Sequence, residues 1–87
     1  MSINLHEYVG CMTLDVVMQI PDGYTIDSDE LEQELFDNGE WNLSYFHDDP
    51  TYPQPYCVAT FDVMISDNII DVYQFCIAAL QRLLRED

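Results

Sequence analysis

A strict two-residue alternation in the segment 11–20 constrains the fold more than any other feature of the sequence. One side of this segment is wholly apolar and consists of Met12, Leu14, Val16, Met18 and Ile20, whereas the other side is mixed. Side chains of a strand alternate between the two faces of a sheet. The pattern therefore predicts a strand with one face against a helical layer, ended by the turn signal Pro21-Asp22-Gly23.

Two helices are predicted in the rest of the chain. The first begins after Asp27, an N-cap with Glu30 three residues later, which is a capping-box arrangement. We expect Asn38-Gly39 to end it with a left-handed C-cap. The second begins at a cap formed by Ser66 or Asp67 and extends to about Leu84, because its apolar residues follow helical spacing.

Two further strands complete the prediction. Residues 41–46 carry Trp41, Leu43 and Tyr45 on one face, and residues 56–65 have an apolar face made of Cys57, Ala59, Phe61, Val63 and Ile65. The order β-α-β-β-α over 87 residues predicts a single α+β domain, residues 1–87. We expect two helices on one face of a small three- to four-stranded, largely antiparallel sheet. Residues 1–10 are either an N-terminal arm or an extra strand.

The charge balance is extreme. The chain has 17 Asp and Glu residues against two arginines, Arg82 and Arg85, and its net charge is −15. Solubility of a small domain needs a net charge of only about 2–8 in magnitude. A fold of this size exposes roughly 5,300 Å², or about one net charge per 350 Å². B-DNA, taken as a cylinder of roughly 10 Å radius, has one charge per about 110 Å², so the acids must cluster to resemble it.

The acids do cluster in the sequence. Nine of them fall within residues 27–49, namely Asp27, Asp29, Glu30, Glu32, Glu34, Asp37, Glu40, Asp48 and Asp49. Glu30, Glu34 and Asp37 have the spacing i, i+4, i+7, which predicts one row of carboxylates about 5–6 Å apart on the first helix. We expect no Lys or Arg to relieve this row. The row is either a solvated helix face or an array of carboxylates that occupies the phosphate-binding positions of a nuclease or DNA-binding protein.

Aromatic residues and prolines follow the acids in the segment 45–56, which contains three prolines. Binding hot spots favour tyrosine, and prolines lower the cost of ordering a loop; the alternative is a connecting loop whose aromatics cap the core. The candidate partner-binding residues are therefore Asp29, Glu30, Glu32, Glu34, Asp37, Glu40, Tyr45, Asp48, Asp49 and Tyr52.

No arrangement of residues predicts catalysis or a cofactor. The sequence has no Cys-x-x-Cys, His-Glu-x-x-His or calcium-loop pattern, and we expect neither an enzyme nor a dedicated metal site. Cys11, Cys57 and Cys76 are predicted to be buried free thiols of a reducing compartment. Without a signal-peptide pattern or an apolar stretch of about 20 residues, the expected location is cytoplasmic. The charge disfavours direct binding to nucleic acid or to an anionic membrane.

In size and composition the whole chain resembles small phage-encoded DNA-mimic inhibitors, a class that includes anti-restriction and anti-CRISPR proteins. The resemblance implies an inhibitor, in the host cytoplasm, of the basic site of a CRISPR effector, restriction enzyme or repair enzyme. Two alternatives are an immunity protein or antitoxin that neutralises a basic nuclease toxin, and an acidic housekeeping domain of a halophile. The wide apolar coverage of the second helix, including Ile70, Phe75 and Ile77, leaves homodimerisation open.

Overall fold

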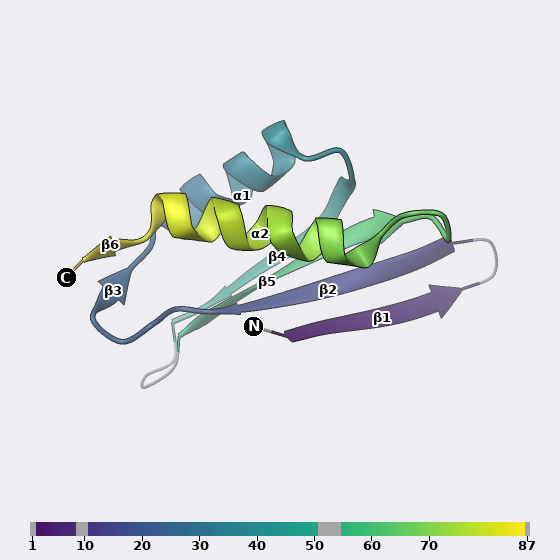
Figure 1. Cartoon of the computed structure of the whole chain (residues 1–87). Coiled ribbons are helices and arrows are strands. Elements are labelled where there is room, and N and C mark those ends of the chain that lie inside the picture. Colours follow the sequence, from purple (N-terminus) through teal and green to yellow (C-terminus); the bar gives the residue numbers. More distant parts are fainter. Residues whose placement is uncertain (1, 9–10, 51–54, 87) are drawn as a thin grey trace.

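The computed structural model describes residues 2–8, 11–50 and 55–86 (Figure 1). Within them, an antiparallel sheet has the strand order β1-β2-β5-β4, and two helices cover one of its faces. The elements of this unit are β1 (Ser2–Tyr8), β2 (Cys11–Gln19), α1 (Ser28–Asn38), β4 (Asn42–Asp49), β5 (Tyr56–Val63) and α2 (Ile69–Leu83). A short pair, β3 (Tyr24–Thr25) with β6 (Arg85–Glu86), lies at one end. The predicted α+β fold and its order are confirmed, and the N-terminal segment is an extra strand.

The core lies between the helices and the two central strands. Leu14, Val16 and Met18 of β2 are fully buried, as are Cys57, Ala59 and Phe61 of β5, and the helices add Leu31, Leu35, Val72, Cys76, Ala79 and Leu80. Because β2 and β5 pair in antiparallel register, their alternating apolar residues fall on the same face. This face is the one that the helices cover, so the alternation in the sequence determines where the core forms.

A bulge at Ser44 changes which side chains of β4 face the core. The register of β4 on β5 shifts by one residue between Leu43 and Tyr45. The extra residue turns Tyr45 away from the helices, where it is 57% exposed, while Leu43 and Phe46 both pack against the core. The prediction that Trp41, Leu43 and Tyr45 share one face is therefore wrong for Tyr45.

The start of α1 agrees with the prediction, but its end does not. Asp27 is the N-cap and accepts hydrogen bonds from the backbone N–H groups of Asp29 and Glu30 at 3.0 and 3.3 Å. Gly39 follows the helix with φ −87° and ψ 146°. This is an extended conformation, so the expected left-handed C-cap is wrong. Glycine is needed there for space: a Cβ would lie 2.8 Å from the carbonyl oxygen of Leu35.

Replacing Gly39 with alanine is therefore expected to lower the free energy of unfolding by about 1–3 kcal/mol, the cost of overpacking a tight contact. The added Cβ would also lie 3.1 Å from the ring of Phe75. Urea denaturation measures the change, and Gly23→Ala is a contrasting control. Gly23 has open space around it but a φ of 81°. Any loss of stability in Gly23→Ala therefore comes from the backbone conformation and not from a steric contact. If Phe75→Leu in the same chain fails to relieve the Gly39→Ala defect, the ring contact is not its cause.

The segment between β5 and α2 also differs from the prediction. The N-cap of α2 is Asn68, whose side chain accepts a hydrogen bond from the N–H of Ile70 at 3.0 Å, and not Ser66 or Asp67. Asp67 instead accepts from the N–H of Met64 and closes a turn. This turn ends the strand at Val63, so Ile65 is 90% exposed and the prediction that it shares the apolar face of β5 is wrong.

Candidate protein-binding surface

The outward side of α1 carries acids around one exposed aromatic ring. Leu31 and Leu35 bury the opposite side of the helix. Asp29, Glu32 and Asp37 are exposed, and Phe36, seven residues after Asp29, is 63% exposed between them. The amide of Gln33 donates a hydrogen bond to Asp37 at 2.7 Å. We call Asp29, Glu32, Phe36 and Asp37 the outer face of α1.

The flank of α1 that lies toward α2 is neutralised by both arginines of the chain. Arg82 forms an ion pair with Glu34, and Arg85 forms one with Glu30 at 3.2 Å. The expectation that no Lys or Arg relieves the row of Glu30, Glu34 and Asp37 is therefore wrong. The local sequence pattern could not show this pairing, because the partners are 48 and 55 positions apart in the chain.

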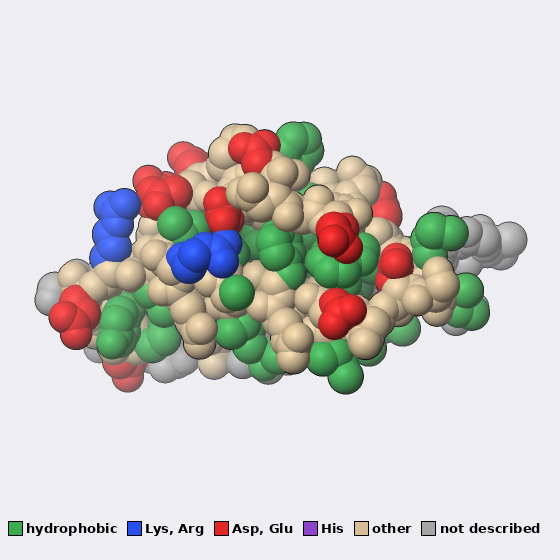
Figure 2. All heavy atoms as spheres, turned by 45° about the horizontal axis from the view of Figure 1, so that its top comes forward, with side chains coloured by type: hydrophobic (Ala, Val, Ile, Leu, Met, Phe, Trp, Pro, Cys, Tyr) green, Lys and Arg blue, Asp and Glu red, His purple; other side chains and the backbone are tan. Residues whose placement is uncertain are grey.

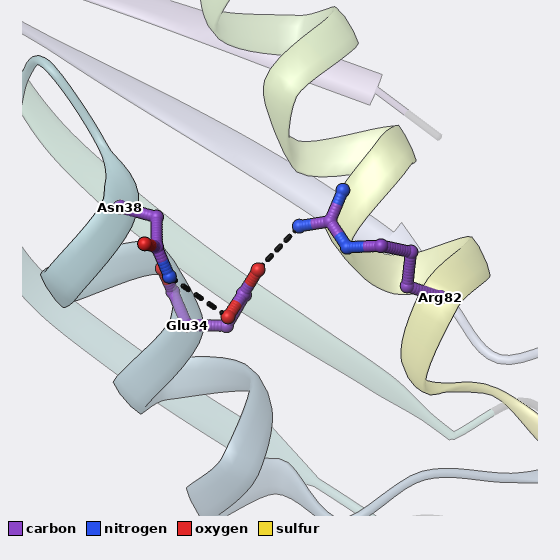
Figure 3. A network of polar contacts seen from close by, with 3 residues as sticks. All are labelled: Glu34, Asn38 and Arg82. Atoms are coloured by element: carbon purple, nitrogen blue, oxygen red, sulfur yellow. Dashed lines mark hydrogen bonds and ion pairs between the residues drawn. The ribbon is translucent and has the colours of Figure 1, made fainter.

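Glu34 is held from two sides (Figure 3). One of its carboxylate oxygens accepts from the Arg82 guanidinium, and the other accepts from the Asn38 side-chain amide at 2.9 Å. The same amide nitrogen reaches the carbonyl oxygen of Glu34 at 3.4 Å. Glu34 is thus tied to α2 and to the last turn of its own helix, which makes it a structural residue and not a carboxylate left open to a partner.

The two acids at the end of β4 point to opposite sides of the sheet. Asp48 lies on the helical side, where it accepts hydrogen bonds from the Ser28 hydroxyl at 3.0 Å and the Cys57 thiol at 3.8 Å. Asp49 lies on the side without helices and accepts a hydrogen bond from the Tyr56 hydroxyl. That hydrogen bond and the carboxylate charge raise the pKa of Tyr56. Asp48 therefore joins the sheet to the start of α1, while Asp49 is separated from the helices.

Tyr45 belongs with Asp49 on the face without helices. Its ring stacks on that of His47, with ring centroids 6.3 Å apart and an angle of 11° between the ring planes. The remaining candidate, Tyr52, lies outside the described residues. The structure therefore brings the α1 acids together with Glu40, which follows the helix, but it places Tyr45 and Asp49 on another surface.

Two features of the surface were missed in the sequence. Phe36 is not among the predicted binding residues, although its position seven residues after Asp29 puts it on the side of α1 away from Leu31 and Leu35; helical geometry applied residue by residue would have found it. Asp71 received no role because it stands alone in an apolar helix. Only the packing of the first turns of α2 beside the end of α1 brings it near Glu40.

The buried thiols take no part in this surface. Cys57 and Cys76 are free and buried, as predicted, and the side chain of Cys11 lies outside the described residues. Burial raises the pKa of Cys57 to about 12, with a further contribution from the neighbouring charge of Asp48. Burial alone raises the pKa of Cys76 to about 12. Thiols that keep their protons at neutral pH are poor nucleophiles.

These shifts predict an alkaline loss of stability. An unfolded thiol ionises near its ordinary pKa of 9.0, whereas the folded thiols remain protonated to about pH 12. The contribution is complete below about pH 9 and decreases as the pH rises toward 12, at about 1.4 kcal/mol per pH unit for each thiol. Urea denaturation across this range should show a steeper decline for the parent chain than for Cys76→Ala. Identical slopes would contradict the assignment.

On the side of the molecule drawn in Figure 2, acidic side chains are spread along the helical layer, and both arginine side chains lie toward one end of it. The folded chain exposes 5601 Å², which gives about one net negative charge per 370 Å². Among the described residues, no group of three or more His, Cys, Asp or Glu side chains is placed to hold a metal ion. In the same part of the chain, no helix is both long and apolar enough to cross a membrane.

Comparison with protein-family models, curated proteins and solved structures finds no match to the chain. The resemblance to DNA-mimic inhibitors therefore concerns size and composition alone. Two features of the surface bear on function. The outer face of α1 carries acids around an aromatic ring, and both arginines, Arg82 of α2 and Arg85 of β6, are already paired.

Proposed function

We propose that the protein is a polyacidic inhibitor whose outer face of α1 occupies the basic DNA- or RNA-binding site of a nucleic-acid-processing protein. The observation that carries the proposal is the position of the two arginines. Both pair with Glu30 and Glu34 on the flank toward α2, and the sequence contains no other Lys or Arg. The outer face of α1 is therefore left with one sign of charge.

The helix suits this role because it holds its acids rigidly. Asp29 and Glu32 are three residues apart on the helix, a spacing that puts their Cβ atoms about 5–6 Å from each other. A preformed array of this kind binds without the cost of ordering a loop. Phe36 supplies an apolar anchor among the charges, the combination that interface hot spots use. Carboxylates on this surface would also steer a basic partner toward it, which speeds association at low salt.

Capture from a bacterial lysate tests the proposal. The tagged protein is immobilised, bound proteins are eluted with a salt gradient, and a parallel column is eluted with duplex DNA. One nucleic-acid-processing protein, released by moderate salt and also by DNA, is the expected result. A specific partner that DNA does not release would favour an immunity protein or antitoxin. Many basic proteins leaving together at low salt would show that the charge acts generically and would contradict mimicry.

Removing the two arginines is expected to leave partner binding intact while lowering stability. Exposed ion pairs contribute about 0–1 kcal/mol each, so Arg82→Gln with Arg85→Gln should reduce the free energy of unfolding by about 2 kcal/mol or less. The loss of two cations makes the protein more negative, so its elution from the partner should require the same or higher salt. Elution at clearly lower salt would place the arginines in the interface and contradict the assigned surface.

A further inference from the structure

A hollow of about 280 Å³ lies between the end of α1, the connection that leads to β4 and the first turns of α2. Its lining residues are Asn38, Glu40, Trp41, Asp71 and Phe75. We propose that this hollow receives an arginine side chain of the protein partner. The inference rests on the proposed function, because a basic nucleic-acid-binding site is where such an arginine would come from.

The groups around the hollow carry negative charge, which favours binding of a cation. Glu40 and Asp71 are both exposed, and neither is in an ion pair within the described residues. The last turn of α1 contains no basic residue, although the carbonyl groups at a helix C-terminus carry partial negative charge that a cation stabilises. Asn38 directs its amide nitrogen at Glu34, so the amide oxygen is the acceptor that it retains.

The aromatic residues select the kind of cation. The rings of Trp41 and Phe75 have centroids 5.9 Å apart and are tilted by 51°. A planar guanidinium stacks on an aromatic ring while its N–H groups pair with carboxylates, whereas an ammonium is more strongly hydrated and has no face to stack. Two aromatic rings beside two carboxylates therefore fit arginine better than lysine.

The size of the hollow agrees with one side chain. Pockets for small molecules and cofactors enclose about 300–1,000 Å³ and bury most of the ligand. The volume here is below that range, and the exposed acids at its rim leave it open to solvent. A long side chain that enters from another protein fits both properties, because its backbone stays outside.

Trp41 allows a direct test, since it is the only tryptophan in the chain. Its fluorescence is measured while N-acetylarginine amide, N-acetyllysine amide or N-acetylcitrulline amide is added to the intact protein. The expected result is a saturable change with the arginine probe, a weaker change with the lysine probe and none with the uncharged citrulline probe. Equal responses to arginine and citrulline, or a response that never saturates, would overturn the proposal.

Two variants with the same change in charge complete the test. Glu40→Gln with Asp71→Asn should weaken the arginine response by at least about tenfold, because both charged acceptors are lost. Asp22→Asn with Glu86→Gln removes two exposed acids that lie away from the hollow and should leave the response unchanged. Equal losses in both variants would mean that arginine senses only the net charge, which would also overturn the proposal.

Binding of the captured partner and release of that partner by DNA separate the arginine site from the proposed mimicry of nucleic acid. If DNA releases the captured partner but the Glu40→Gln, Asp71→Asn variant still binds that partner as tightly as the parent chain, the hollow is not the arginine site and mimicry stands. If the Trp41 fluorescence change saturates with the arginine probe but DNA does not release the partner, the hollow binds guanidinium groups and the proposed mimicry of nucleic acid is wrong.

Discussion

Neutralising Asp29, Glu32 and Asp37 together is expected to weaken binding to the captured partner by roughly a hundredfold or more. Close charge pairs across an interface couple by about 1.5 kcal/mol or more each, and about 1.4 kcal/mol corresponds to tenfold in affinity. All three side chains are exposed on the outer face of α1 and lie away from the core. The substitutions Asp29→Asn, Glu32→Gln and Asp37→Asn should therefore leave the fold intact while removing binding.

The control variant has the same change in net charge, but its three substitutions lie outside α1. Asp22→Asn, Asp62→Asn and Glu86→Gln replace three exposed acids outside α1. Binding of both variants is measured by calorimetry at one salt concentration, with thermal unfolding as a check on the fold. An equal loss in both variants would show that net charge, and not the outer face of α1, determines binding.

Replacing Phe61 with alanine is expected to lower the free energy of unfolding by about 3–5 kcal/mol. Phe61 is fully buried on the central strand β5, where its register partners are Leu14 of β2 and Leu43 of β4. A domain of this kind is stable by only about 5–15 kcal/mol in total. The variant should therefore lose a large part of its stability, which is measured as a lower urea midpoint.

Val58→Ala on the same strand is the matched control. Val58 is only partly buried and lies on the face of β5 that no helix covers. A change of about 1 kcal/mol or less is expected there, as for substitutions outside a core. Comparable losses at Val58 and Phe61 would contradict the one-sided core.

The sequence predicted the fold correctly where a local pattern is compatible with only one kind of structure. Strict alternation located β2 and β5, and the capping side chain of Asp27 located the start of α1. These signals act between residues close in the chain. They therefore need no knowledge of which elements meet, which explains why the element order and the layer arrangement were both correct.

Predictions failed where tertiary contacts decide the outcome. The bulge at Ser44 turned Tyr45 outward because it keeps Leu43 and Phe46 on the core face. Gly39 is extended, and the space around its Cα is limited by the Leu35 carbonyl oxygen and by the Phe75 ring of α2. Neither the bulge nor the extended glycine can be recognised from the local sequence pattern.

The candidate site shows the same division. The acids of α1 were correctly grouped, because helical spacing alone puts them on one element. Their separation into a paired flank and an open outer face depends on Arg82 and Arg85, which reach α1 from the far end of the chain. The hollow at Trp41 likewise requires the end of α1 and the first turns of α2 to meet, so no spacing rule could have located it.

A competition titration shows whether the protein and nucleic acid occupy the same site on the partner. The affinity of the protein for its captured partner is measured at increasing concentrations of duplex DNA and at constant salt. If both ligands occupy one site, the apparent Kd rises in proportion to the DNA concentration without limit. An apparent Kd that levels off, or does not change, would mean that both ligands bind the partner together, and that the acidic surface does not take the place of nucleic acid.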